Sequence, residues 1–172
     1  MGDKRNVTDE FRGKSVESIK HILDERRQPM QIAIENIERD FNMGTIVRSA
    51  NAFNVSTIHI IGRKQWNKRG AMVTDKYMNV TYHQSVDDFV AAVGDLPIIG
   101  VDNIPGSKPL SSVALPRACV LVFGSESSGI SNTMIAVCQQ LVAIEQFGST
   151  RSINVGVAAG VVMYEWLRQN VL

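Results

Sequence analysis

The arrangement of apolar residues constrains the fold of this chain more than any other feature of its sequence. Short runs rich in Val and Ile alternate with segments of helical periodicity, which is the pattern of strands that alternate with helices. Strands whose residues are apolar on both faces are typical of a parallel sheet covered by helices on both sides. The predicted fold class is therefore α/β, a parallel β-sheet flanked by helices. The strands are expected at residues 31–37, 57–62, 79–83, 97–101, 118–124 and 141–145, and the helices at 43–54, 85–93, 131–140 and 153–169.

The charge pattern predicts a boundary near the start of the first strand. Residues 1–28 are dense in both charge signs, and Val16, Ile19 and Ile22 share one face of a predicted amphipathic helix. We therefore expect an N-terminal helical extension over residues 1–28, packed on one domain that spans residues 29–172. A chain of 172 residues is long enough for one domain with a sizeable core.

Composition argues against several classes of protein. The formal net charge of +1 excludes a globally basic chain but not a local basic patch. Cys119 and Cys138 lie in apolar segments and are expected to be buried thiols, and His21, His59 and His83 lack the spacing of metal ligands. The chain has no apolar run long enough to span a membrane and no apolar core of a signal peptide near residue 1. The expectation is a cytoplasmic protein without a metal.

Ligands of parallel α/β sheets bind at the carboxyl ends of the strands, so the loops that follow the strands are the candidate site. The first of them, "ERDFNMGTIVRSANAF", follows the strand at 31–37. Asn42 fits a helix N-cap, Gly44 permits close approach, and Arg48 lies nearly two turns after Asn42, so that both could face the site. The alternative is a capped helix with a surface arginine.

The second loop, "VLVFGSESSGIS", places a carboxylate directly after a buried strand. Glu126 lies between Gly124 and Gly129, two glycines that permit tight turns. The loop matches neither a P-loop nor a dinucleotide fingerprint. A serine-rich turn with a solvated glutamate is an equally good interpretation of this loop alone.

The third loop, "FGSTRSINVGVAAG", runs into the last predicted helix. Ser152 and Asn154 lie at the helix start, where they either cap the helix or reach into a site, and Arg151 adds a positive charge. Gly156 and Gly160 are four residues apart, a spacing that lets another backbone approach closely. Capping and tight core packing are the alternatives.

A fourth segment, residues 62–70, combines cations with an aromatic residue. Arg63, Lys64, Lys68 and Arg69 surround Trp66, and no acidic residue interrupts them. Such a combination fits phosphate contact and base stacking in nucleic-acid binding. A solvated basic loop is the alternative.

Together the three loops resemble the motifs of the SpoU/TrmH-type RNA 2'-O-ribose methyltransferases of the SPOUT superfamily. The matching segments are Asn42-x-Gly44-x-x-x-Arg48-Ser49, Gly124-x-Glu126-x-x-Gly129-Ile130 and Ser152-Ile153-Asn154-Val155. The resemblance covers about residues 30–169. It implies a C-terminal deep trefoil knot, S-adenosyl-L-methionine as the cofactor, tRNA or rRNA as the substrate, and a homodimer with the first-motif helix and the last helix near the interface.

The resemblance also implies roles for individual residues. Arg48 is expected to be the central catalytic residue, either as the base or as a clamp on a phosphate of the RNA. The remaining catalytic positions are Asn42, Glu126, Ser152 and Asn154, with Glu126 paired to Arg48 or to a backbone amide. The cofactor would be held at Val101, Gly124, Ile144, Ser152 and Ile153, and the RNA at Arg48, Arg63, Lys64, Lys68, Arg69 and Arg151. A base-methylating SPOUT enzyme and a non-catalytic RNA-binding module of the same fold are the alternatives.

Overall fold

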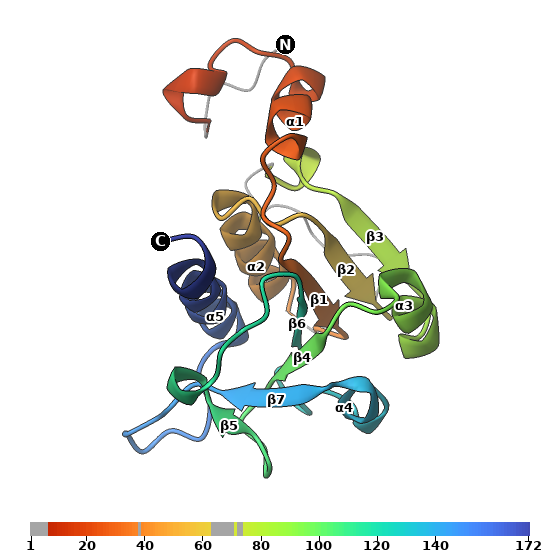
Figure 1. Ribbon diagram of the computed structural model, residues 1–172, viewed down its shortest axis with the longest axis vertical. Coiled ribbons are helices and arrows are strands. Elements are labelled where there is room, and N and C mark those ends of the chain that lie inside the picture. The colour runs from red at the N-terminus through yellow and green to blue at the C-terminus, as the bar shows by residue number, and fades with distance from the viewer. Residues whose placement is uncertain (1–6, 38, 63–70, 72–73) are drawn as a thin grey trace.

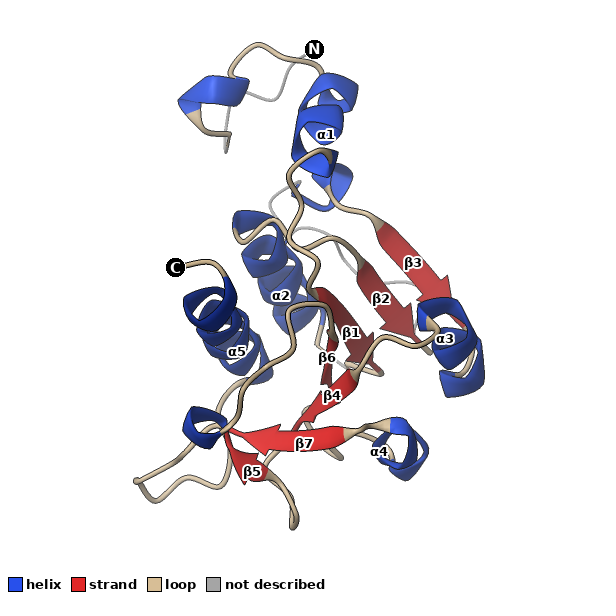
Figure 2. Ribbon diagram, in the orientation of Figure 1, coloured by secondary structure: helices blue, strands red, loops and turns tan. Residues whose placement is uncertain are grey.

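Parallel strands form the centre of the molecule, as Figures 1 and 2 show. The computed structural model describes residues 7–37, 39–62, 71 and 74–172, and within them seven strands form one sheet in the order β3-β2-β1-β6-β4-β7-β5. All neighbouring strands pair in parallel. The predicted parallel sheet is thus confirmed. The strands are β1 (Gln31–Glu35), β2 (Ile58–Ile61), β3 (Val80–His83), β4 (Ile98–Val101), β5 (Lys108–Pro109), β6 (Val120–Phe123) and β7 (Gln140–Ala143).

The helices begin where a polar side chain can satisfy the free N–H groups of the first turn. The oxygens of Ser15, Ser85, Ser131 and Asn154 accept hydrogen bonds from backbone N–H groups at the starts of four helices. A fifth helix, α2, begins after Arg39 without a side-chain cap. The helices are α1 (Val16–Asp24), α2 (Asp40–Ala52), α3 (Val86–Val93), α4 (Asn132–Val137) and α5 (Val155–Asn170).

Two hydrophobic cores lie on the two faces of the sheet. Helices α2 and α5 pack side by side on one face, where Ile46 and Trp166 are fully buried with alternate strand residues such as Ile34. Helices α3 and α4 cover the other face, where Phe89 and Met134 are buried. Because both faces are covered, strand residues of either orientation are buried, which explains the continuous apolar runs in the sequence.

The N-terminal segment packs on the domain through a smaller apolar cluster. Phe11 and Ile19 are buried against Tyr77, which belongs to the 3-10 helix Thr74–Tyr77. The Arg27 guanidinium is nearly buried and donates to the Tyr77 carbonyl oxygen at 2.6 Å and to the Val55 carbonyl oxygen at 3.1 Å. The segment therefore contacts the domain through polar as well as apolar groups.

Two of the histidines form a buried pair. His59 Nε2 lies 2.7 Å from Gln31 Oε1, so Nε2 donates and His59 Nδ1 accepts from His83 Nε2 at 2.9 Å. Both rings contact Phe89 edge-on. Burial, and to a lesser degree the neighbouring His83, lowers the pKa of His59 to about 4. The pair is therefore neutral at pH 7.

The structure departs from the sequence-based expectations at some element ends. The strand β5 is only two residues long and was not predicted, and α2 begins at Asp40 rather than near residue 43. Cys119 and Cys138 are free thiols, and Cys119 is buried as expected, whereas Cys138 is only half-buried. In the described part of the chain, every helix is too short or too polar to cross a membrane.

Candidate functional site

A cavity of about 490 Å³ lies at the carboxyl edge of the sheet. The loops that follow β1, β4, β6 and β7 line it, which is where ligands of parallel α/β sheets bind. Its volume falls within the range of about 300–1,000 Å³ that is usual for small-molecule sites. Apolar and polar side chains share its lining, and the part formed by Asn42, Glu126 and Asn154 is called the rim. The lining includes Val101, Phe123, Gly124, Ile144, Ile153, Val155 and Ala158 together with Asn42, Asp102, Glu126, Ser152 and Asn154.

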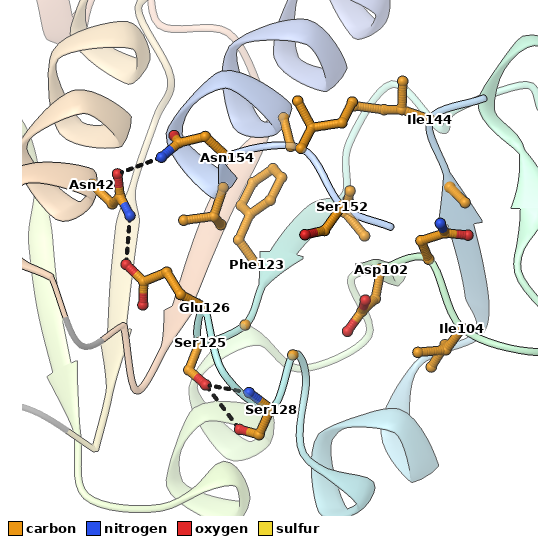
Figure 3. A pocket seen from close by; sticks show the side chains of 18 of the residues that line it. Asn42, Asp102, Ile104, Phe123, Ser125, Glu126, Ser128, Ile144, Ser152 and Asn154 are labelled. Atoms are coloured by element: carbon orange, nitrogen blue, oxygen red, sulfur yellow. Dashed lines mark hydrogen bonds between the residues drawn. The ribbon is translucent and has the colours of Figure 1, made fainter. Parts of the chain in front are cut away.

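A chain of hydrogen bonds joins three of these loops across the rim (Figure 3). Asn42 Nδ2 donates to Glu126 Oε1 at 2.6 Å, and Asn154 Nδ2 donates to Asn42 Oδ1 at 3.0 Å. The partners are 84 and 112 residues apart in the sequence, so only the folded sheet brings them together. Asn42 is 3% exposed, so both ends of its amide are satisfied by protein in a nearly dry position.

The two ends of this chain determine the orientation of both amides. Asn154 Oδ1 accepts from Gly156 N at 2.9 Å and Val157 N at 3.2 Å, because the N-terminus of α5 offers only donors. Asn154 Nδ2 must then face Asn42 Oδ1, which leaves Asn42 Nδ2 for the Glu126 carboxylate. The N–H groups at the start of α5 thereby fix the orientation of the Asn154 amide, and Asn154 fixes that of the Asn42 amide. As a result, Asn42 Nδ2 donates to Glu126.

The loop 124–131, between β6 and α4, approaches its own backbone closely. Ser125 and Gly129 exchange backbone hydrogen bonds of 3.0 Å, and Ser128 N donates to Ser125 Oγ at 3.2 Å. A Cβ on Gly124 would collide with the backbone of Gly129, and Gly129 has a positive φ of 68°. Both motif glycines are therefore required by the geometry of the turn.

Carboxylates at the ends of β1 and β4, the two strands that flank β6, hold the far end of this loop. Glu35, which ends β1 and is 3% exposed, accepts from Ser131 N at 2.9 Å and Ser131 Oγ at 2.6 Å. Asp102, which follows β4, accepts from Ile130 N at 2.9 Å. The loop is thus fixed before any ligand binds.

Close packing of α5 on α2 positions Asn154 next to Asn42. A Cβ on Gly156 would lie 3.0 Å from Thr45 Cγ2, which is tighter than ordinary side-chain contact, so glycine permits the approach. A Cβ on Gly160 would meet only Ser49 Oγ, at 3.9 Å. Tight packing was expected for both glycines, but the structure shows it only at Gly156.

Most residues expected at the site line the cavity. They are Asn42, Val101, Gly124, Glu126, Ile144, Ser152, Ile153 and Asn154. Arg48 and Arg151 are exposed and do not line it, and Arg63, Lys64, Lys68 and Arg69 lie outside the described residues. The neighbours Ile46, Val47 and Ala50 face the core, so Arg48 points away from it.

Two expectations about the first loop were wrong. Asn42 does not cap α2, because the helix begins earlier and the Asn42 amide is used by Glu126 and Asn154. Asn42 and Arg48 do not both face the cavity, because Asn42 is buried at its rim and Arg48 is exposed. Of the partners expected for Glu126, the backbone amide is present, since Arg39 N lies 3.4 Å from Glu126 Oε1 at the start of α2.

Sequence-based reasoning missed two charged residues of the cavity, Arg39 and Asp102. Asp102 follows the predicted strand 97–101 directly, so its position at a strand end was a usable signal. Arg39 follows the first predicted strand by two residues and carries the same signal.

Comparison with known proteins finds a family model and several relatives that match most of the chain. The model of the family described as "SpoU rRNA Methylase family" matches residues 29–164. The tRNA (guanosine(18)-2'-O)-methyltransferase of Escherichia coli K12 is 25% identical over 150 residues, 84% of this chain and 66% of that protein. The 23S rRNA (guanosine-2'-O-)-methyltransferase RlmB of Neisseria meningitidis serogroup B is 30% identical over 152 residues, 84% of this chain and 60% of that protein. The chain thus spans 66% and 60% of the lengths of these two relatives.

Solved structures share the fold. The TrmH/SpoU tRNA modifying enzyme of A. aeolicus superimposes with a TM-score of 0.79 and 22% identity, over 90% of this chain and 81% of that one. The AdoMet-bound rRNA methyltransferase of Sinorhizobium meliloti superimposes with a TM-score of 0.77 and 21% identity, over 87% of this chain and 60% of that one. At these identities the likeness establishes the arrangement of the sheet and its helices.

Proposed function

Because the chain belongs to the SpoU rRNA Methylase family, we propose that it is an S-adenosyl-L-methionine-dependent RNA methyltransferase that acts on a ribose 2'-hydroxyl in tRNA or rRNA. The observation that carries the proposal is the hydrogen-bonded chain Glu126–Asn42–Asn154. It joins all three motif loops at the rim of one cavity of cofactor size. Relatives named as tRNA and rRNA guanosine 2'-O-methyltransferases support the reaction and the substrate class.

The cavity suits S-adenosyl-L-methionine in shape and chemistry. Val101, Gly124, Ile144 and Ile153, with Ser152 beside them, line one part of the cavity, and we propose that their backbone groups form the slot that holds adenine. We propose that the C-terminal part of the chain forms a deep trefoil knot around this slot, as the fold likeness to the TrmH/SpoU enzyme supports.

The cofactor supplies a methyl group that a hydroxyl oxygen can attack directly, so the protein has mainly to align the two reactants and receive a proton. The hydrogen bonds that join Glu126, Asn42 and Asn154 orient these three polar side chains toward the target ribose. Arg48 clamps a phosphate of the RNA. Because an arginine guanidinium is not deprotonated in proteins, a phosphate oxygen or water receives the hydroxyl proton.

We further propose a homodimer through α2 and α5. Val157, Val161 and Tyr164 of α5 are exposed, and Phe41 at the start of the neighbouring α2 is 74% exposed. Burying such side chains is favourable by about 25 cal/mol for each Å² of apolar surface. Arg48 is exposed on the same pair of helices, so it would lie at or near this interface.

The RNA would bind around the cavity mouth, in the cytoplasm, where tRNA and rRNA are found. Arg151 is exposed in the loop that precedes α5. Arg63, Lys64, Lys68 and Arg69, which lie outside the described residues, would add further cations for phosphate contact. The helical extension over residues 1–28 would accompany a methyltransferase domain over residues 29–172.

Identification of the methylated nucleoside tests the reaction. The purified protein is incubated with isotope-labelled S-adenosyl-L-methionine and unmodified tRNA or rRNA, and the digested RNA is separated by mass spectrometry. We expect label in a 2'-O-methylnucleoside. A methyl group on a base would support the base-methylating alternative, and RNA binding without transfer to any substrate would support a binding module.

Arg48→Lys tests the phosphate clamp. Lysine keeps the charge but loses the planar fork that holds phosphate at two points, so methylation should fall about 10- to 100-fold. Binding of S-adenosylhomocysteine, measured by calorimetry, should not change. Arg12→Lys, at an exposed arginine of the N-terminal segment, is the matched control. Normal methylation by Arg48→Lys would contradict the role of Arg48.

A further inference from the structure

Asp102 has one carboxylate oxygen, Oδ1, that accepts no hydrogen bond from the described residues. Its Oδ2 accepts from Ile130 N at 2.9 Å, whereas no described residue donates to Oδ1. The residue is half-buried, and its carboxyl group lies in the cavity on the side away from Asn42 and Glu126 (Figure 3). An acceptor placed in this way is available to a donor on a ligand.

The position of this carboxylate is fixed by the surrounding loops. Asp102 N donates to the Val142 carbonyl oxygen at 3.0 Å, and the Asp102 carbonyl oxygen accepts from Ser107 Oγ at 2.7 Å. On the opposite side, a Cβ on Gly129 would collide with the carboxylate, so glycine makes room for it. A group held in place before binding loses little freedom when a ligand arrives.

We propose that Asp102 binds the ribose hydroxyls of the cofactor, an inference that rests on the proposed function. The adenosine would lie against the backbone of Val101 and Gly124. Val101 is the neighbour of Asp102, and the loop that begins at Gly124 is bonded to its Oδ2. The sugar attached to the adenine therefore falls next to Oδ1, and its hydroxyls are suitable donors. The rim at Asn42 and Glu126 is left for the RNA.

Calorimetry with three nucleosides tests this assignment. The probes are 5'-methylthioadenosine, its 2',3'-dideoxy analogue and S-adenosylhomocysteine. A hydrogen bond to a charged group is worth about tenfold in affinity or more. The parent protein should therefore bind methylthioadenosine at least about tenfold tighter than the dideoxy analogue. In Asp102→Ala this ratio should fall to about two or less.

The ratio separates ribose contact from a structural effect. Loss of the bond to Ile130 N in Asp102→Ala would weaken both probes equally and leave their ratio unchanged. Asp102→Asn, which keeps an acceptor for Ile130 N, should give an intermediate ratio. Asp95→Ala, at an exposed aspartate in the turn after α3, is the matched control and should bind as the parent does.

Three outcomes would overturn the assignment. The first is a ratio of affinities for methylthioadenosine and its dideoxy analogue that is as large in Asp102→Ala as in the parent protein. The second is a loss confined to S-adenosylhomocysteine, because the carboxylate would then bind the amino group of the amino-acid part. The third is a parent protein that binds no probe, which would overturn the proposed function as well.

Discussion

Replacing Asn154 by Ser and by Ala should separate the two roles of its side chain. Its Oδ1 caps α5 through Gly156 N and Val157 N, and its Nδ2 donates to Asn42 Oδ1. Serine is a good N-cap and keeps the first role, but it has no group that reaches Asn42. Alanine removes both roles.

The contacts of Asn154 indicate how much free energy of unfolding each variant should lose. Loss of an N-cap costs about 0.5–2 kcal/mol, and loss of a neutral hydrogen bond about 0.5–1.5 kcal/mol. Because Asn154 is exposed, we expect the loss of free energy for each interaction to be no larger than the middle of its range. We expect Asn154→Ser to lower the free energy of unfolding by about 1 kcal/mol and Asn154→Ala by about 2 kcal/mol.

Urea unfolding measures both values, and a double-mutant cycle with Asn42→Ala isolates the bond between the two amides. The coupling energy between Asn42→Ala and Asn154→Ser should be about 1 kcal/mol. Methylation rates should fall about tenfold in both Asn154 variants, because Asn42 loses the partner that orients it. A coupling energy near zero, or a serine variant as unstable as the alanine variant, would refute the reasoning.

Three further predictions concern stability and are measured by urea unfolding. Gly156→Ala should lower the free energy of unfolding by about 1–3 kcal/mol, because the new Cβ would press on Thr45. Gly160→Ala should raise the free energy of unfolding by up to about 1 kcal/mol. Equal effects of the two substitutions would contradict the packing described. Burial lowers the pKa of His59 from 6.5 to about 4, so the unfolded chain takes up a proton first as the pH falls. Stability attributable to this group is complete above pH 6.5 and decreases by about 3 kcal/mol toward pH 4. The His59→Gln variant should lose correspondingly less stability than the parent over that interval, and parallel pH profiles would exclude the effect. Glu35→Ala leaves Ser131 N and Oγ without their acceptor and should cost about 2–4 kcal/mol, more than Glu35→Gln, which retains an acceptor.

The sheet could be predicted because its evidence is local. Each strand is a short apolar run, and burial of both faces follows from residues within that run, such as Ile32 and Ala33 on opposite sides of β1. The edge strand β5 could not be predicted, since Lys108 and Pro109 carry no apolar signal. Its two residues pair only because β7 lies next to them.

The site could be predicted only in part, because some of its determinants are distant in the sequence. Asn42 is locally a good N-cap, and nothing near it indicates that Glu126 and Asn154 will take its amide instead. Because α2 begins at Asp40, Asn42 lies within the helix, and six residues at about 100° each place Arg48 on a different face from Asn42. The position directly after a strand, by contrast, was sufficient to locate Glu126 near the cavity.

The hydrogen bonds across the rim of the cavity also bear on the order of events during folding. Asn42 is made early in synthesis, but its partners follow 84 and 112 residues later. Contacts between such distant residues form slowly, because a long loop must close before they stabilise anything. The cavity is therefore complete only after α5 has packed against α2. A ligand of the cavity would bind the finished fold alone, so its binding would report the last step of folding and stabilise the native chain by mass action.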